Sequence, residues 1–212
     1  MPAFLIRLLP RHRPIAVLAI ALPLLLSGCA ALQPEPAPQV SASQRHYHND
    51  IQLGGRLSVR YEVPSGEEGV HGSFEWLQAN DRTTLTLFSP LGQAIARIVA
   101  TPHGATLTQA GKAPIAADDV DSLTTQTLGW PLPVSGLRDW LQGFAVDTDG
   151  QRFIATPDNN AATTPEGWHI SYPAWTGEGS TGARPRRVDL VRQTEQAGKV
   201  ALRIVIDTWQ AP

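Results

Sequence analysis

The sequence predicts one α+β domain, built on an antiparallel sheet with short helices gathered on one side. Three observations predict this class. Apolar and polar residues alternate after residue 50, helical spacing replaces the alternation between about 117 and 144, and turn residues separate the alternating segments. A sheet with one apolar face can curl into an unclosed β-barrel, and two helices can cover its open side as a lid around an apolar cavity.

The alternating segments predict strands with one buried face and one solvated face. The pattern runs through residues 51–61, 70–76, 84–87 and 200–207. Strands of this kind are usually antiparallel. Hairpin turns are expected at residues 64–66, 80–81, 103–104, 149–150 and 196–198.

Two short helices are expected inside the interruption. Asp118 is placed to cap the first helix, which ends at the Gly-Trp-Pro of residues 129–131. Ser135 opens the second helix, in which three large apolar residues share one side, and Gly143 ends it. A third short helix is expected over residues 43–49.

The N-terminus has the features of a bacterial export signal. Three arginines precede an apolar segment from Ile15 to Leu26, which is too short to span a bilayer comfortably. The Leu-Ser-Gly-Cys at residues 26–29 holds the only cysteine and looks like a lipobox, whose cysteine thiolate is joined to a diacylglycerol. The alternative is an ordinary signal peptide with a chance cysteine. We predict a lipoprotein signal peptide over residues 1–28 and lipidation at Cys29.

The residues that follow indicate a tether and a location. Residues 29–44 are rich in Pro, Ala and Gln, which is typical of a semi-extended tether. Ala30 stands where an aspartate usually marks retention at the inner membrane in proteins of this type. We therefore expect a lipid anchor in the outer membrane, facing the periplasm, and a monomeric domain over residues 45–212.

The composition excludes several partners. Residues 1–28 hold three of the 17 Lys and Arg residues, so the mature chain carries 14 basic and 19 acidic residues. An acidic domain without basic runs is not expected to bind nucleic acid or to dock on anionic lipid by charge. Once Cys29 is acylated, no thiol is left for a disulfide or a zinc-thiolate site.

The sequence shows no catalytic motif. It has neither G-x-S-x-G nor H-E-x-x-H. The His-Tyr-His of residues 46–48 has no further ligand at a spacing that would complete a metal shell, and residues 147–150 lack the ligands of a calcium loop. We therefore expect no enzyme activity, no metal and no cofactor.

Two features remain open to a structural and a functional interpretation. Leu91 lies in a predicted turn, between proline and glycine, where polar residues are normal. It either folds back into the core or projects toward a membrane or a partner, where its exposure costs about 1.5–3 kcal/mol. Similarly, the six tryptophans either fill a core or line a ligand cavity.

A set of short motifs extends over most of the mature chain after the lipobox. They are Gly-Arg-Leu-Ser-Val at 55–59, Gly-Ser-Phe-Glu-Trp at 72–76, Ser-Pro-Leu-Gly-Gln at 89–93, Leu-Pro-Val at 132–134 leading to Leu137, Trp140, Leu141 and Gly143, Gly-Trp-His-Ile-Ser-Tyr at 167–172, Arg-Pro at 184–185, and an apolar strand ending at Trp209. Because the motifs occur in this order and at this spacing, the chain resembles the LolB family of outer-membrane lipoprotein receptors.

The resemblance implies an unclosed β-barrel with a helical lid over an apolar cavity. It also implies that the chain accepts triacylated lipoproteins from the periplasmic carrier LolA and inserts them into the outer membrane. The family's protruding aliphatic residue falls on Leu91, so the loop of Pro90, Leu91 and Gly92 is predicted to enter the membrane. Strand parity and helix face select the predicted acyl-chain cavity residues, which are Trp76, Leu87, Ile98, Trp140 and Trp168.

Two other classes of protein compete with this interpretation. A structural or scaffold lipoprotein would have a packed core and no ligand cavity. A periplasmic hydrolase on a lipid tether would need a nucleophile and a base, for which the sequence has no signature.

Overall fold

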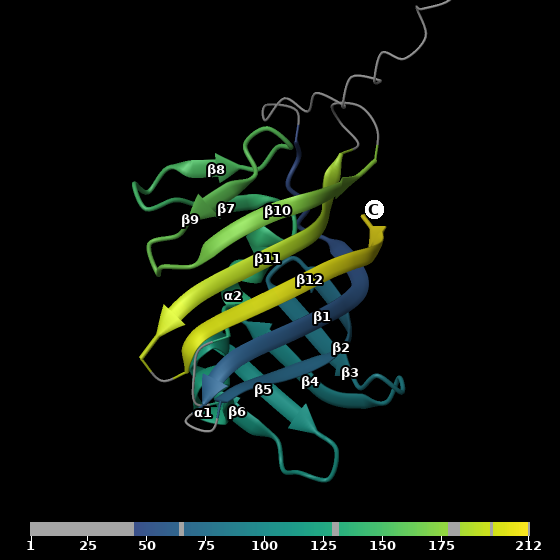
Figure 1. Ribbon diagram of the computed structural model, residues 1–212. Helices are drawn as coiled ribbons and strands as arrows, with labels where there is room; N and C mark the ends of the chain where they lie inside the picture. Colours follow the sequence, from purple (N-terminus) through teal and green to yellow (C-terminus); the bar gives the residue numbers. More distant parts are fainter. Residues whose placement is uncertain (1–44, 64–65, 129–131, 178–182, 196, 212) are drawn as a thin grey trace, which may run out of the picture. The chain divides into compact units, whose positions relative to one another are not determined.

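The computed structural model describes residues 45–63, 66–128, 132–177, 183–195 and 197–211. The predicted signal peptide, Cys29 and the tether lie outside these residues and stay predictions, as does the end of the first helix at 129–131. The described chain forms a large sheet, a two-stranded sheet and two helices (Figure 1). Their bounds are β1 Ile51–Val63, β2 Gly66–Ala79, β3 Arg82–Phe88, β4 Ala94–Thr101, β5 Gly104–Gln109, β6 Ile115–Ala117, α1 Val120–Leu128, α2 Val134–Trp140, β7 Phe144–Val146, β8 Arg152–Ile154, β9 Ala161–Thr163, β10 His169–Thr176, β11 Arg184–Thr194 and β12 Gly198–Gln210.

The large sheet is antiparallel and unclosed. Its ten strands follow the order β6-β5-β4-β3-β2-β1-β12-β11-β10-β9, so β6 and β9 are its edges. The helices lie behind the curved sheet in Figure 1, where α1 packs against β5 and β6 and α2 against β7. The predicted α+β class with an antiparallel, unclosed sheet and two short helices is confirmed. Within the described residues, neither helix is long and apolar enough to span a membrane.

Register explains the apolar inner face of the sheet. Leu53 pairs with Trp76, Trp76 with Leu85, Leu85 with Ile98 and Ile98 with Leu107. All five side chains are buried. Because side chains alternate along each strand, this single row across five strands assigns the inner face of every strand it crosses.

Two glycines allow neighbouring strands to approach closely. A Cβ atom at Gly55 would lie 2.0 Å from the carbonyl oxygen of Val205, and one at Gly72 would lie 2.2 Å from that of Phe88. The β1–β12 register shifts at Gly55, as expected at a β-bulge. These positions therefore accommodate the bending of the sheet.

The helix starts differ by one residue from the prediction. The side chain of Asp119, not Asp118, accepts hydrogen bonds from the N–H (2.7 Å) and the hydroxyl (2.6 Å) of Ser122. This is the geometry of an N-cap. Likewise α2 begins one residue before Ser135, whose N–H instead donates to Asp121 of α1 (3.3 Å) and so ties the two helices together.

The predicted third helix is wrong over its described part. Residues 45–50, here named the strap, contain no helix. The Arg45 guanidinium donates to the carbonyl oxygens of Ala155 (2.7 Å) and Gln142 (2.6 Å), and it lies 5.1 Å from the ring centre of Trp175. Burial lowers the pKa of Arg45. These long-range contacts override the weak local preference for a helix.

Candidate functional site

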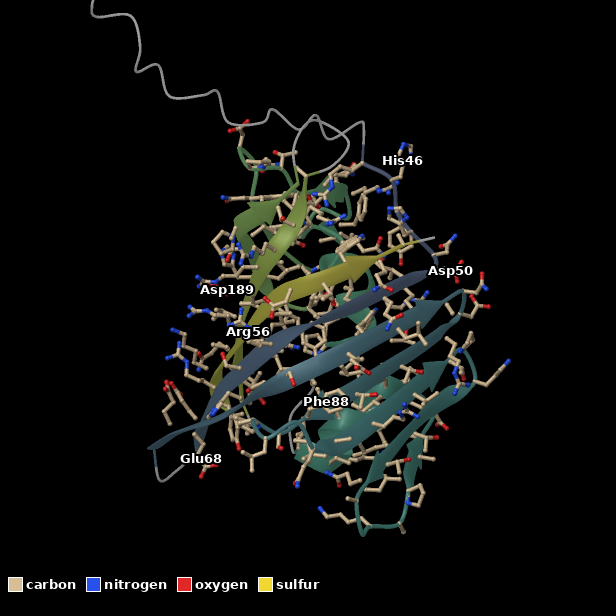
Figure 2. The ribbon with its side chains drawn as sticks, turned by 90° about the vertical axis from the view of Figure 1, so that its right-hand side faces the viewer. His46, Asp50, Arg56, Glu68, Phe88 and Asp189 are labelled. Atoms are coloured by element: carbon tan, nitrogen blue, oxygen red, sulfur yellow. The ribbon has the colours of Figure 1, made fainter. Side chains whose placement is uncertain are left out.

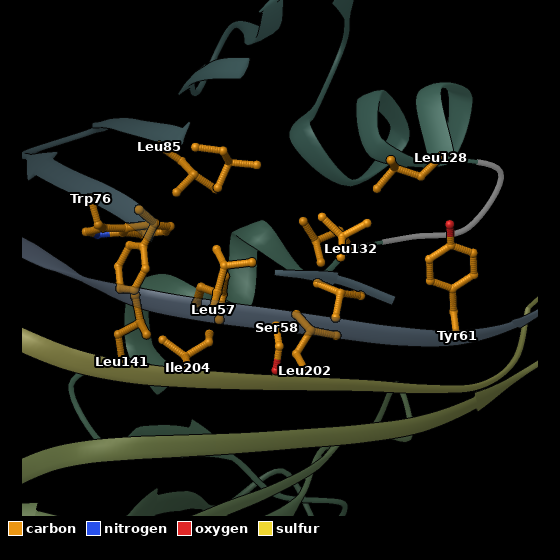
Figure 3. A pocket seen from close by; sticks show the side chains of 15 residues that line it. Leu57, Ser58, Tyr61, Trp76, Leu85, Leu128, Leu132, Leu141, Leu202 and Ile204 are labelled. Atoms are coloured by element: carbon orange, nitrogen blue, oxygen red, sulfur yellow. The ribbon is translucent and has the colours of Figure 1, made fainter. Parts of the chain in front are cut away.

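An apolar cavity of about 190 Å³ lies between the inner face of the sheet and the helices (Figure 3). Its wall comes from β1, β2, β3, β12, α1 and α2. Among the residues that line it, only Ser58, Tyr61 and Trp76 have a polar side-chain atom. A ligand there would meet almost no hydrogen-bonding partner, which favours a hydrocarbon.

The cavity runs from a buried end to a partly exposed rim. Trp76 and Leu141 are almost fully buried, whereas Val70 and Leu128 are 51% and 49% exposed. Figure 3 shows Leu128 and Tyr61 on the side of the cavity opposite to Trp76 and Leu141. The rim of the cavity therefore presents two half-exposed aliphatic side chains to solvent.

Tyr61 also carries a polar group to the rim. Its hydroxyl donates to the carboxylate of Glu68 on β2 at 3.1 Å, and this hydrogen bond raises the pKa of Tyr61. The ring can thus line the cavity while the hydroxyl stays paired outside it.

Two of the five predicted cavity residues line this cavity. They are Trp76 and Leu87. Ile98 does not reach it and instead belongs to the buried core. Trp140 and Trp168 do not reach it either, because their rings pack against each other with centres 6.4 Å apart.

The misplaced Trp140 has a simple geometric cause. The prediction put Leu137, Trp140 and Leu141 on one side of the helix. Only Leu137 and Leu141 line the cavity. Consecutive helical residues are about 100° apart, so Trp140 and Leu141 point in clearly different directions.

Most of the wall consists of aliphatic residues that the sequence did not single out. Several of them belong to the alternating segments, so the alternation of apolar and polar residues predicts that their side chains point inward. The missed residues with the clearest signal are Leu57, Val59, Leu202 and Ile204.

The β3–β4 loop presents Leu91 to solvent. The Ser89 N–H donates to the carbonyl of Gln93 (2.8 Å) and the Gly92 N–H to that of Ser89 (2.9 Å), which closes a tight turn through Pro90. Gly92 has φ +78°, a conformation that favours glycine. Leu91 is 88% exposed, so the alternative in which it folds back into the core is wrong.

The loop and the cavity are close in the chain. Leu87 lines the cavity, and Leu91 follows four residues later, within about 14 Å even for an extended chain. β3 ends at Phe88, opposite Ser73, while β2 extends past it toward Gly66. Figure 2 shows Phe88 and Glu68 in the lower half of the molecule and His46 in the upper half, so the loop lies away from the strap.

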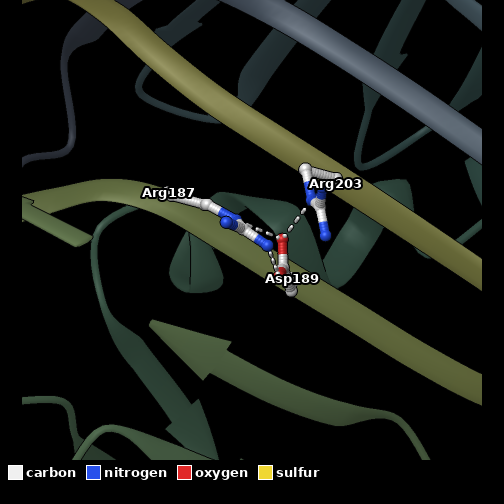
Figure 4. A network of polar contacts seen from close by, with 3 residues as sticks. All are labelled: Arg187, Asp189 and Arg203. Carbon is white, nitrogen blue, oxygen red and sulfur yellow. Dashed lines mark hydrogen bonds and ion pairs between the residues drawn. The ribbon is translucent and has the colours of Figure 1, made fainter. Parts of the chain in front are cut away.

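The outer face of the sheet is charged. Asp189 accepts hydrogen bonds from Arg187 (2.9 Å) and Arg203 (3.3 Å), as Figure 4 shows. Arg56 pairs with Asp207 at 2.9 Å, and this contact lowers the pKa of Asp207. The arginines of these pairs are exposed to solvent, which screens the attraction, so the pairs contribute little to the stability of the fold.

The sequence of the chain is similar to those of known proteins. The sequence profile of a family described as "Outer membrane lipoprotein LolB" matches residues 49–209. The outer-membrane lipoprotein LolB of Cupriavidus pinatubonensis is 39% identical over 210 residues, which cover 95% of this chain and 98% of that protein. LolB of Cupriavidus metallidurans is 40% identical over 207 residues, which cover 93% of this chain and 97% of that protein.

Among solved structures, the LolA superfamily protein NE2245 from Nitrosomonas europaea is similar, with a TM-score of 0.44 and 8% identity over 81% of this chain and 90% of that one. The family rests on the sequence matches, which extend over nearly the whole chain. The chain belongs to the LolB family and is an outer-membrane lipoprotein with a receptor role in lipoprotein localization.

Proposed function

We propose that this chain accepts triacylated lipoproteins from the periplasmic carrier LolA and inserts them into the outer membrane. Cys29 carries its lipid anchor, the apolar cavity receives the acyl chains, and Leu91 enters the bilayer. The observation that carries the proposal is an apolar cavity lined by β3, the strand that leads into the loop of an almost fully exposed leucine.

The energy of the cargo lipid explains why an acceptor is needed. A triacyl group has on the order of 40 methylenes, and each contributes about 0.8 kcal/mol to the cost of exposure. Unassisted passage of a triacylated lipoprotein through water is therefore negligible. An acceptor only has to offer apolar surface between the carrier and the bilayer, so no bond needs to be made or broken.

The size of the cavity implies a movement. Its volume of about 190 Å³ is of the order of a cavity that holds one benzene molecule, far too small for three acyl chains. We propose that α1 and α2 act as a lid that moves away from the β1–β2 strands. The half-exposed Val70 and Leu128 mark the rim where this opening would begin.

The scaffold alternative requires a packed core. The cavity is an observation against it, and uptake of a fluorescent fatty acid by the full chain separates the two. Replacing Leu57 in the cavity wall by asparagine should lower that uptake, because an acyl chain cannot pair with the amide.

The decisive experiment tests Leu91 in the lipidated chain. Leu91→Glu, reconstituted in vesicles and supplied with cargo-loaded LolA, should still take the cargo from LolA. Delivery into the bilayer should fall about tenfold or more, since the leucine no longer buries and a carboxylate must be kept in water. Leu77→Glu is the matched control, because Leu77 is another exposed leucine, on β2.

The outcomes address separate parts of the proposal. Normal delivery by Leu91→Glu would remove the loop from the mechanism. Cargo that stays on LolA in the presence of the unchanged protein would remove the acceptor function itself.

A further inference from the structure

We infer that the surface of this chain that enters the bilayer includes Ile95, on β4, the strand that follows the Leu91 loop. This surface, here named the tip, consists of residues 88–95. The inference rests on the proposed function, in which Leu91 enters the membrane. It adds a second insertion residue, Ile95, and a depth at which insertion stops.

Charge supports a lipid partner for the tip. No charged residue occurs from Thr83 to Ala96, between Arg82 and Arg97. Burying a charge in a bilayer costs several kilocalories per mole, so an uncharged segment is the first requirement for insertion. The β3–β4 tip meets this requirement along its whole length.

A β-bulge places Ile95 on the surface. Phe88 pairs with Ala94 and Leu87 with Ala96, so Ile95 has no partner residue on β3. Ile95 is 43% exposed. Bulges redirect side chains and are frequent at functional edges. An isoleucine on the bulge next to the loop therefore adds apolar surface beside Leu91.

Arg97 marks the expected limit of insertion. It lies two positions after Ile95, or about 7 Å along the strand. Its Nε atom donates to the hydroxyl of Thr86 at 3.4 Å, which holds the side chain along the sheet. A guanidinium at this level can stay among lipid headgroups while Ile95 and Leu91 lie deeper.

The small size of the tip favours a bilayer over a protein. A stable protein interface needs roughly 1,000 Å² or more of buried area, which a few side chains at one turn do not supply. A bilayer has no such threshold, because each buried methylene contributes about 0.8 kcal/mol independently. We therefore assign the tip to the bilayer interface.

Single cysteines test this assignment in the full, lipidated chain. Cys29 is the only cysteine. In the proposed function its sulfur is joined to a diacylglycerol and cannot be labelled, so Leu91→Cys, Ile95→Cys and Leu77→Cys each offer one labelling site. An environment-sensitive fluorophore is attached, and the protein is reconstituted in phosphatidylethanolamine–phosphatidylglycerol vesicles containing spin-labelled lipid. The unchanged chain controls for labelling at Cys29.

We expect loss of fluorescence at positions 91 and 95 and none at 77. Leu77 is the matched control because it is apolar, lies on the same sheet and has a similar exposure of 49%. Quenching at 91 with none at 95 would overturn the inference and leave the proposed function intact. Absence of quenching at both would contradict the membrane role of the loop as well.

A delivery assay tests whether the contact matters. Ile95→Asn should slow cargo delivery by up to about tenfold while uptake from LolA is unchanged, whereas Leu77→Asn should alter neither. If LolA, in the absence of lipid, protected the cysteine at position 95 from labelling, the tip would be assigned to a protein partner and the inference would be overturned.

Discussion

The space under the sheet is filled in one half and hollow in the other. Near β10, the Tyr172 ring packs against Phe153 and Trp175, with centres 6.5 and 6.1 Å apart, and Trp140 packs against Trp168. Under β1, β2 and β12, mainly aliphatic side chains surround a cavity of about 190 Å³. Both halves have the same alternation of apolar and polar residues. The difference shows that paired rings close the interior, whereas apolar character alone does not.

The largest expected effect removes a ring from the filled half. Trp168 is almost fully buried, packs on Trp140 and lies under the Arg192 guanidinium. Trp168→Ala should lower the free energy of unfolding by about 3–5 kcal/mol, measured by urea denaturation. Leu57→Ala in the cavity wall should cost less, below about 2 kcal/mol, because fewer packing contacts are lost beside a hollow. Equal losses of unfolding free energy in the two variants would mean that the two halves are packed alike.

A larger side chain should destabilise the filled half more than the hollow half. Leu190→Phe, at a fully buried position, should destabilise the protein by about 1–3 kcal/mol because no space is available. Leu57→Phe should cost less than about 1 kcal/mol, since the ring can enter the cavity. Only the second variant should also lower uptake of the fatty-acid probe. A large loss of stability from Leu57→Phe would argue that the cavity is not free space.

The sequence predicted the sheet and the loop well because their signals are local. Alternation assigned the inner face, and the row from Leu53 through Trp76 to Leu85 follows from it. The proline and glycine around Leu91 indicated a turn, and the structure decided between the two orientations left open for that side chain. A period-two pattern is a property of one strand and needs no knowledge of its neighbours.

The cavity wall was harder to predict because it depends on what lies opposite each side chain. Ile98 and Leu87 have the same inward parity, yet only Leu87 faces free space. The large Trp140 and Trp168 suggested a wall, but two rings that meet fill space instead. The strap was missed for the same reason, since Arg45 is held by carbonyl groups roughly a hundred positions further along the chain.

The smallest predicted effect concerns α1, which brings Leu128 to the rim of the hollow half. Asp119→Ala removes the cap of this helix and should cost about 0.5–1 kcal/mol, whereas Asp119→Asn can still cap. Hydrogen bonds from Ser122 lower the pKa of Asp119, so its contribution is complete above the ordinary aspartate pKa of about 3.9 and is lost as the pH falls through the lowered value. Urea denaturation at neutral and acidic pH should therefore show a gap between the wild type and Asp119→Ala that narrows in acid. Asp119→Asn could also prove as unstable as Asp119→Ala at neutral pH. That result would mean that the cap does not stabilise the N-terminal end of α1.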